Sequence, residues 1–174
     1  FHYTGAKDMI PWINLTRQYH SIQKEIITGI DEVLNSKQYI LGNNVKKFEE
    51  KFSEFHNTKF SVGVNSGTDA LQLALIAIGI KEGDEVITVP NTAVPTICAI
   101  KSTGAKPVFV DIDPNYYTMD PSKLKYAITP KTKAIIPVHL YVKSCTRDKI
   151  IIIANNYKLK VIEDCQQAIG KEKK

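Results

Sequence analysis

The first third of the chain carries apolar residues at helical spacing. Between positions 16 and 37 they recur every three or four residues, which places them on one face of a helix. Thr16 stands where an N-cap is expected. A second stripe of the same kind runs through residues 44–56. The pattern therefore predicts two amphipathic helices, which together form an N-terminal helical arm over residues 9–58.

Short apolar runs alternate with helical segments over the rest of the chain. The predicted strands are residues 60–64, 85–89, 107–110, 134–138 and 161–163. The predicted helices are residues 68–78, 96–102, 122–128 and 148–156. This alternation predicts the α/β class, a three-layer αβα sandwich whose mostly parallel sheet is covered on both faces. Ligands of such sheets bind at the carboxyl ends of the strands, so the residues that follow each strand are the candidates for function.

Composition and charge narrow the functional classes. The 174 residues include 23 Lys and Arg against 18 Asp and Glu, for a net charge of +5, and 43% of them are hydrophobic. This is the profile of one globular domain, or of part of a larger one, and it excludes whole-chain disorder. The basic residues are scattered, without a patch interleaved with aromatic side chains. We therefore expect no nucleic-acid partner.

The termini and the cysteines indicate a cytoplasmic protein. The densest aliphatic runs are far shorter than the roughly 20 residues that span a bilayer, so no membrane segment is expected. Residues 1–8 lack a signal-peptide pattern and are expected to be a tag or a disordered leader. Cys98, Cys145 and Cys165 are widely spaced and odd in number. This arrangement suits neither a disulfide framework nor a zinc site, and we expect no bound metal.

A small polar turn follows the first predicted strand and opens directly into a helix. Residues 65–70 read Asn-Ser-Gly-Thr-Asp-Ala. The free N–H groups and the positive dipole end of a helix attract anions, and Gly67 permits a ligand to approach the backbone closely. Ser66 and Thr68 offer hydroxyl donors. Plain N-capping by either hydroxyl is the alternative, and the turn alone does not separate the two.

Two adjacent acids follow the last predicted strand. Side chains alternate along a strand, so Glu163 and Asp164 point to opposite faces and only one of them enters the ligand crevice. A carboxylate buried there needs a cationic partner, and the protonated ring nitrogen of a heterocyclic ligand is one such partner. The alternative is an ordinary solvated or capping acid. His139, after the preceding predicted strand, is expected to be a structural hydrogen-bonding residue near the site.

These motifs, taken together and in order, resemble the DegT/DnrJ/EryC1/StrS family of pyridoxal-phosphate-dependent nucleotide-sugar aminotransferases. The resemblance covers essentially all residues from 9 to 170. The segments that carry it are residues 42–45, 48–49, 64–71, 83–87, 104–113, 137–141, 163–164 and 167–168. It implies the large domain of the type I pyridoxal-phosphate fold over residues 59–174, incomplete and without the family's C-terminal small domain.

The resemblance also implies a cofactor site, with pyridoxal 5'-phosphate as the cofactor. Ser66, Gly67 and Thr68 match the turn that cradles the phosphate. Asp164 matches the acid that pairs with the pyridinium nitrogen, and Gln167 matches the glutamine beside the ring. The remaining position departs from the family, because Ala93 stands where an aromatic residue usually stacks on the ring.

The implied reaction transfers an amino group from glutamate to a nucleotide-linked keto-deoxysugar in a homodimer. The family's Schiff-base lysine lies beyond Lys174, so the resemblance assigns no catalytic residue to this chain, and we expect the chain alone to be inactive. Two alternatives stay open. One is a truncated or pseudo-enzyme fragment that serves as a binding or dimerisation module or has no function of its own; the other is a relative that performs dehydration.

Overall fold

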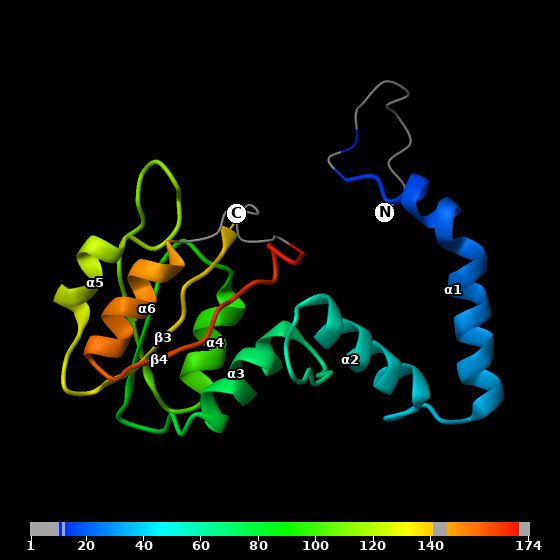
Figure 1. Ribbon diagram of the computed structural model, residues 1–174, viewed down its shortest axis with the longest axis horizontal. Helices are drawn as coiled ribbons and strands as arrows, with labels where there is room; N and C mark the ends of the chain where they lie inside the picture. The colour runs from blue at the N-terminus through cyan, green and yellow to red at the C-terminus, as the bar shows by residue number, and fades with distance from the viewer. Residues whose placement is uncertain (1–10, 12, 141–145, 171–174) are drawn as a thin grey trace. The chain divides into compact units, whose positions relative to one another are not determined.

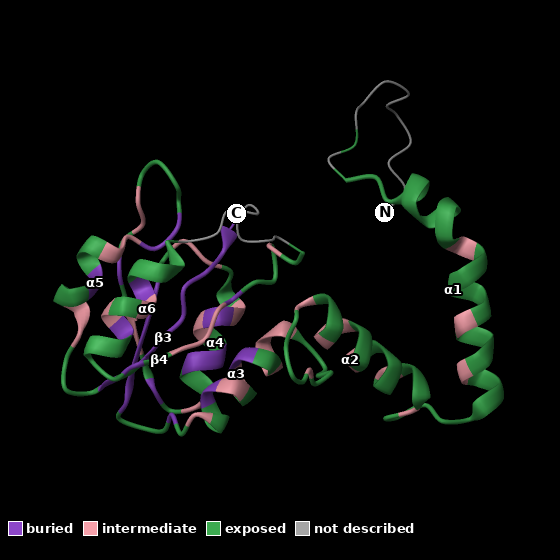
Figure 2. Cartoon of the chain, in the orientation of Figure 1, coloured by how far each residue is buried: buried purple, intermediate pink, exposed green. Residues whose placement is uncertain are grey.

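The computed structural model describes residues 11, 13–140 and 146–170, and the chain divides into two units between Ser61 and Val62. The described part of the first unit contains helices α1 (Thr16–Ser36) and α2 (Asn43–Phe55) (Figure 1). Both helices form where the apolar spacing predicts them. Neither contains a buried residue, and Figure 2 shows both mostly as exposed surface.

Two local predictions for the first 64 residues are wrong. Thr16 is not the N-cap of α1, because Leu15 holds that position and the Asn14 side-chain oxygen accepts a hydrogen bond from the Thr16 N–H at 3.0 Å. Residues 60–64 form no strand, and Phe60 is 77% exposed. An extended segment becomes a strand only when a neighbouring strand pairs with it, and no described residue does so.

The second unit contains the predicted parallel sheet. Its four strands are all parallel and lie in the order β2-β1-β3-β4. The strands are β1 (Glu85–Thr88), β2 (Lys106–Phe109), β3 (Thr132–Ile135) and β4 (Lys160–Val161). The helices are α3 (Gly67–Ala77), α4 (Val94–Ser102), α5 (Pro121–Ala127) and α6 (Arg147–Asn156).

Alternating side chains bury both faces of this sheet. Val86 of β1 points into an apolar cluster that includes residues of α3 and α4. Its neighbour Ile87 points into a second cluster, which includes residues of α5 and α6. Figure 2 shows the buried residues concentrated in the sheet and on the helix faces that pack against it. The three-layer αβα sandwich is therefore confirmed.

The connections of the sheet mark the place for a ligand. The chain leaves β1 through α4 to reach β2, then passes through α5 to β3 on the other side of β1. The strand order reverses at this point, so the carboxyl ends of β1 and β3 border a crevice of the kind that holds ligands in open α/β sheets. Among the described residues, no helix is long and apolar enough to cross a membrane.

We expect Leu75→Ala to lower the free energy of unfolding by about 2 to 5 kcal/mol, because it leaves a cavity beneath α3 where Leu75 is fully buried. Leu73→Ala on the same helix is the control. Leu73 is 51% exposed, and its loss should cost less than about 0.5 kcal/mol. Urea denaturation of the two variants measures the difference, and equal losses would contradict the assignment of the core.

Candidate functional site

Backbone pairing continues past the ends of β3 and β4, and it positions the residues of the candidate site. Val138 and Asp164 form an isolated parallel bridge. The His139 N–H donates to the Asp164 carbonyl at 3.0 Å, and the Asp164 N–H donates to the Pro137 carbonyl at 3.0 Å. This pairing places Asp164 directly beside His139 at the carboxyl end of the sheet, where the fold locates a ligand.

Asp164 is a buried acid held by neutral donors. Its side chain lies in a residue that is only 6% exposed. The Thr96 hydroxyl of α4 donates to Oδ2 at 3.0 Å, and the Gln166 backbone N–H lies 3.4 Å from Oδ1. The Thr96 hydroxyl also lies 2.9 Å from that of Thr92. Within the described residues no Lys, Arg or His side chain pairs with the Asp164 carboxylate, so the site is suited to a cation supplied by a ligand.

The start of α3 meets the segment that follows Asp164. Ser66 is the N-cap of α3, because its Oγ accepts from the Asp69 N–H at 3.1 Å. A Cβ added to Gly67 would lie 1.9 Å from the side-chain nitrogen of Gln166. The end of the flexible Gln166 side chain therefore lies against Gly67 at the start of α3. The N-capping interpretation of this turn is confirmed, and the anion-binding interpretation stays a prediction.

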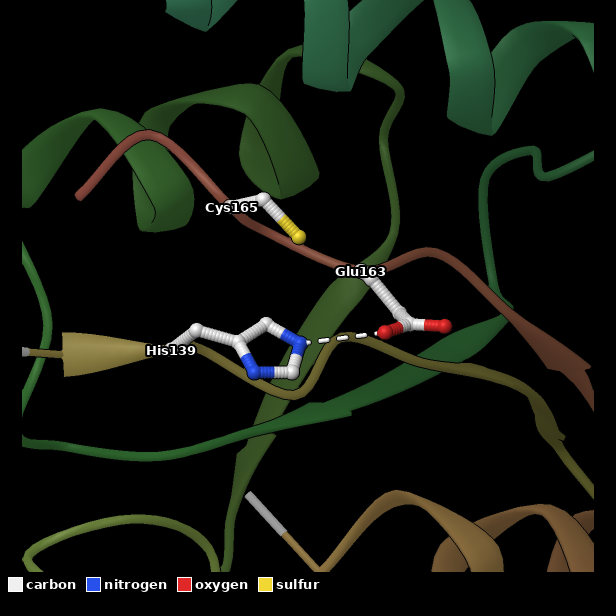
Figure 3. Close-up of side chains that lie close together, drawn as sticks. All are labelled: His139, Glu163 and Cys165. Atoms are coloured by element: carbon white, nitrogen blue, oxygen red, sulfur yellow. Dashed lines mark hydrogen bonds and ion pairs between the residues drawn. The ribbon is translucent and has the colours of Figure 1, made fainter. Parts of the chain in front are cut away.

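Glu163 points to the opposite face, as the alternation predicts. Its Oε2 lies 3.1 Å from Nε2 of His139, which is 4% exposed (Figure 3). Its Oε1 accepts a hydrogen bond from Arg147 Nε of α6. The hydrogen bond with His139, followed by the contacts with Arg147, lowers the pKa of Glu163 from 4.5 to about 2, although burial opposes the shift. His139 is thus a buried hydrogen-bonding residue, as expected.

The remaining candidates lie around this centre. Thr68 is half-buried in the first turn of α3, Ala93 is the exposed N-cap of α4, and Gln167 is exposed in the turn after Asp164. The sequence interpretation missed Thr96, whose signal is a hydroxyl in an otherwise apolar helix start. Residues 141–145, which include Cys145, and residues 171–174 lie outside the described residues.

Comparison with known proteins decides the relationship. The model of the DegT/DnrJ/EryC1/StrS aminotransferase family matches residues 20–174. The chain belongs to this family. A curated relative, the dTDP-3-amino-3,6-dideoxy-alpha-D-galactopyranose transaminase of Aneurinibacillus thermoaerophilus, is 48% identical over 93% of this chain and 45% of its own length. The UDP-2-acetamido-2-deoxy-3-oxo-D-glucuronate aminotransferase of Pseudomonas aeruginosa is 46% identical over the same shares.

A solved structure agrees with the fold. The NtdA crystal structure from Bacillus subtilis, with bound cofactor PMP, superposes with a TM-score of 0.89 at 39% identity. The match covers 92% of this chain and 37% of that one. The chain thus spans less than half the length of the relatives it matches.

We expect Thr96→Val to destabilise the protein by about 1.5 to 3 kcal/mol, the usual value of a hydrogen bond to a charged group. Valine keeps the shape of threonine but leaves Oδ2 of Asp164 without its hydroxyl donor. Thr96→Ser, which keeps the hydroxyl, is the control and should cost less. Urea denaturation compares the two, and a larger loss for serine would show that packing by the methyl group dominates.

Glu163 should make stability depend on acid pH. Because its pKa is lower in the folded protein than in the unfolded chain, its contribution is fully present above about pH 4.5 and disappears as the pH falls towards about 2. Glu163→Gln should therefore lower the melting temperature at pH 7, and the gap to wild type should narrow through this window. Glu32→Gln, on the exposed face of α1, is the control. A gap that is constant with pH would contradict the assignment.

Proposed function

We propose that this chain holds pyridoxal 5'-phosphate at the carboxyl ends of its strands, as the cofactor-binding part of an aminotransferase for nucleotide-linked keto-deoxysugars. The observation that carries the proposal is the buried Asp164 carboxylate, which has neutral donors only among the described residues and lies in the segment that touches the start of α3. The Asp164 carboxylate suits a protonated ring nitrogen, and the start of α3 suits a phosphate.

The start of α3 fits the phosphate of the cofactor. Ser66, Gly67 and Thr68 would bind it through backbone N–H groups and hydroxyls, and the positive end of the helix dipole would favour its charge. Gly67 carries no Cβ at this point, where the end of the flexible Gln166 side chain lies against it. The polar start of the helix is the feature that supports a compact anion here.

Asp164 fits the ring nitrogen. It would keep that nitrogen protonated, while the Thr96 hydroxyl orients the carboxylate and burial excludes competing water. The bound cofactor supplies an electron sink, which only a protonated ring provides. Gln167 would lie beside the ring. Ala93 offers no aromatic face for stacking, so the polar contacts at the ring nitrogen and the phosphate would carry the binding.

The relatives support the substrate class in this proposal. Relatives named for dTDP- and UDP-linked sugars support a nucleotide-linked substrate, and we propose glutamate as the amino donor. A homodimer is supported by the apolar stripe of α1, where Ile22, Ile26 and Ile30 stay 38 to 53% exposed. We also propose that residues 9–58 form a helical arm and residues 59–174 the large domain. Because no lysine in the chain matches the family's Schiff-base position, the 174-residue chain alone should not turn over.

Pyridoxamine phosphate tests the cofactor site, because it binds without a Schiff base. We expect the chain to bind it, and Asp164→Asn to weaken binding by about ten- to a hundredfold, the loss of one charge-assisted hydrogen bond. Isothermal titration calorimetry measures the affinities. The control is Asp31→Asn, the same chemical change on the exposed surface of α1, which should leave the affinity unchanged.

The assigned site and the expected inactivity of the chain are tested by different results. Absence of pyridoxamine phosphate binding, or equal affinity of wild type and Asp164→Asn, would refute the assigned site. Release of 2-oxoglutarate from glutamate in the presence of a nucleotide-linked keto-sugar would refute only the expected inactivity of this chain. Circular dichroism of each variant confirms that the fold is intact before affinities are compared.

A further inference from the structure

A cluster of three metal-ligating side chains lies on the face of the sheet opposite to Asp164. We propose that His139, Glu163 and Cys165 form a binding site for a divalent cation of intermediate softness, with Zn²⁺ as the best match. One ligand atom from each residue, the imidazole nitrogen, a carboxylate oxygen and the thiol sulfur, lies within 4.8 Å of the other two (Figure 3). This site does not depend on the proposed cofactor function.

The backbone explains why the three residues converge. Glu163 and Cys165 flank Asp164, so alternation along the extended chain sends both to one side while Asp164 points to the other. Asp164 meets Thr96 of α4, whereas Glu163 meets Arg147 of α6, which covers the opposite face. The bridge between Val138 and Asp164 then places His139 beside the pair.

The donor set matches the chemistry of zinc. Nitrogen, oxygen and sulfur ligands from His, Glu and Cys are those that bind Zn²⁺ in proteins. The distance of 3.1 Å between His139 Nε2 and Glu163 Oε2 is close to the ~3.3 Å that separates neighbouring ligands of a tetrahedral ion. Three protein ligands leave the fourth position for water or another small ligand, the arrangement of an open zinc site.

The surrounding contacts are compatible with the ion. Arg147 Nε donates to Oε1 of Glu163, and Oε2 is directed at the imidazole of His139. Figure 3 shows the contact between Glu163 and His139. A partner on the distal carboxylate oxygen fixes the orientation of a ligating carboxylate. A hydrogen bond between His139 and Glu163 accounts for two of the three groups. That hydrogen bond does not explain why the Cys165 thiol lies at the same point. A bound cation of intermediate softness would explain the position of all three groups.

Cobalt(II) titration of the 174-residue chain tests the site, since a cysteine ligand gives Co²⁺ a thiolate charge-transfer band in the near ultraviolet. We expect the band to saturate at one equivalent of Co²⁺ and to disappear when Zn²⁺ displaces the cobalt. Cys165→Ser should abolish the band and weaken Zn²⁺ binding at least about tenfold. The matched control is the double variant Cys98→Ser/Cys145→Ser, which keeps Cys165 as the sole thiol and should retain the band.

The outcomes separate a metal site from a hydrogen-bonded cluster. No band in wild type, or a band of unchanged intensity in Cys165→Ser, would overturn the proposal. Loss of the band in the double control with its retention in Cys165→Ser would also overturn it, because another thiol would be the ligand. His139 is buried, so His139→Gln is used only after circular dichroism shows native structure; it should then weaken Zn²⁺ binding as Cys165→Ser does.

Discussion

The backbone bridge between Val138 and Asp164 is the constraint on which the site depends. Two hydrogen bonds of 3.0 Å extend the parallel pairing beyond the short strands β3 and β4. Because side chains alternate along a paired chain, this one bridge decides where three consecutive residues point. Asp164 turns towards α4, while Glu163 and Cys165 turn towards His139. A shift of one residue in the pairing would exchange the two faces and disperse both groups.

The two neighbouring acids meet opposite electrostatic environments. Glu163 finds its hydrogen-bonding partners within the chain, since His139 and Arg147 hold its pKa at about 2. Asp164 finds only hydroxyl and amide donors among the described residues, although it is the more buried of the two. A carboxylate that is buried without a cationic partner costs free energy, and a positively charged ligand group that pairs with it removes this cost. This difference in partners, rather than proximity alone, supports the proposal that Asp164 and not Glu163 faces the cofactor.

The sequence pattern predicts the layers of the fold well, but it does not predict the contacts between distant residues. Alternating apolar runs and helical segments correctly predict the αβα sandwich, and the period of two correctly separates Glu163 from Asp164. Residues 60–64 read as a strand but form none, because pairing depends on a partner that local pattern does not contain. The hydrogen bond from Thr96 to Asp164 joins residues 68 positions apart. No local spacing marks such a pair, and only the sheet order brings it together.

The sheet order also bears on how the proposed cofactor would be held. α4 follows β1 and packs on one face of the sheet. The Thr96 hydroxyl in its first turn therefore reaches the Asp164 carboxylate, which lies just beyond the end of β4. α3 lies on the same face and presents its capped N-terminus to the segment after Asp164. A ligand bound between α4 and the start of α3 would be held by polar contacts at both of its charged ends. Under the proposed function, Ala93 offers no aromatic side chain for stacking, so the contacts at those two ends would supply most of the binding energy, and the burial of Asp164 would strengthen one of them.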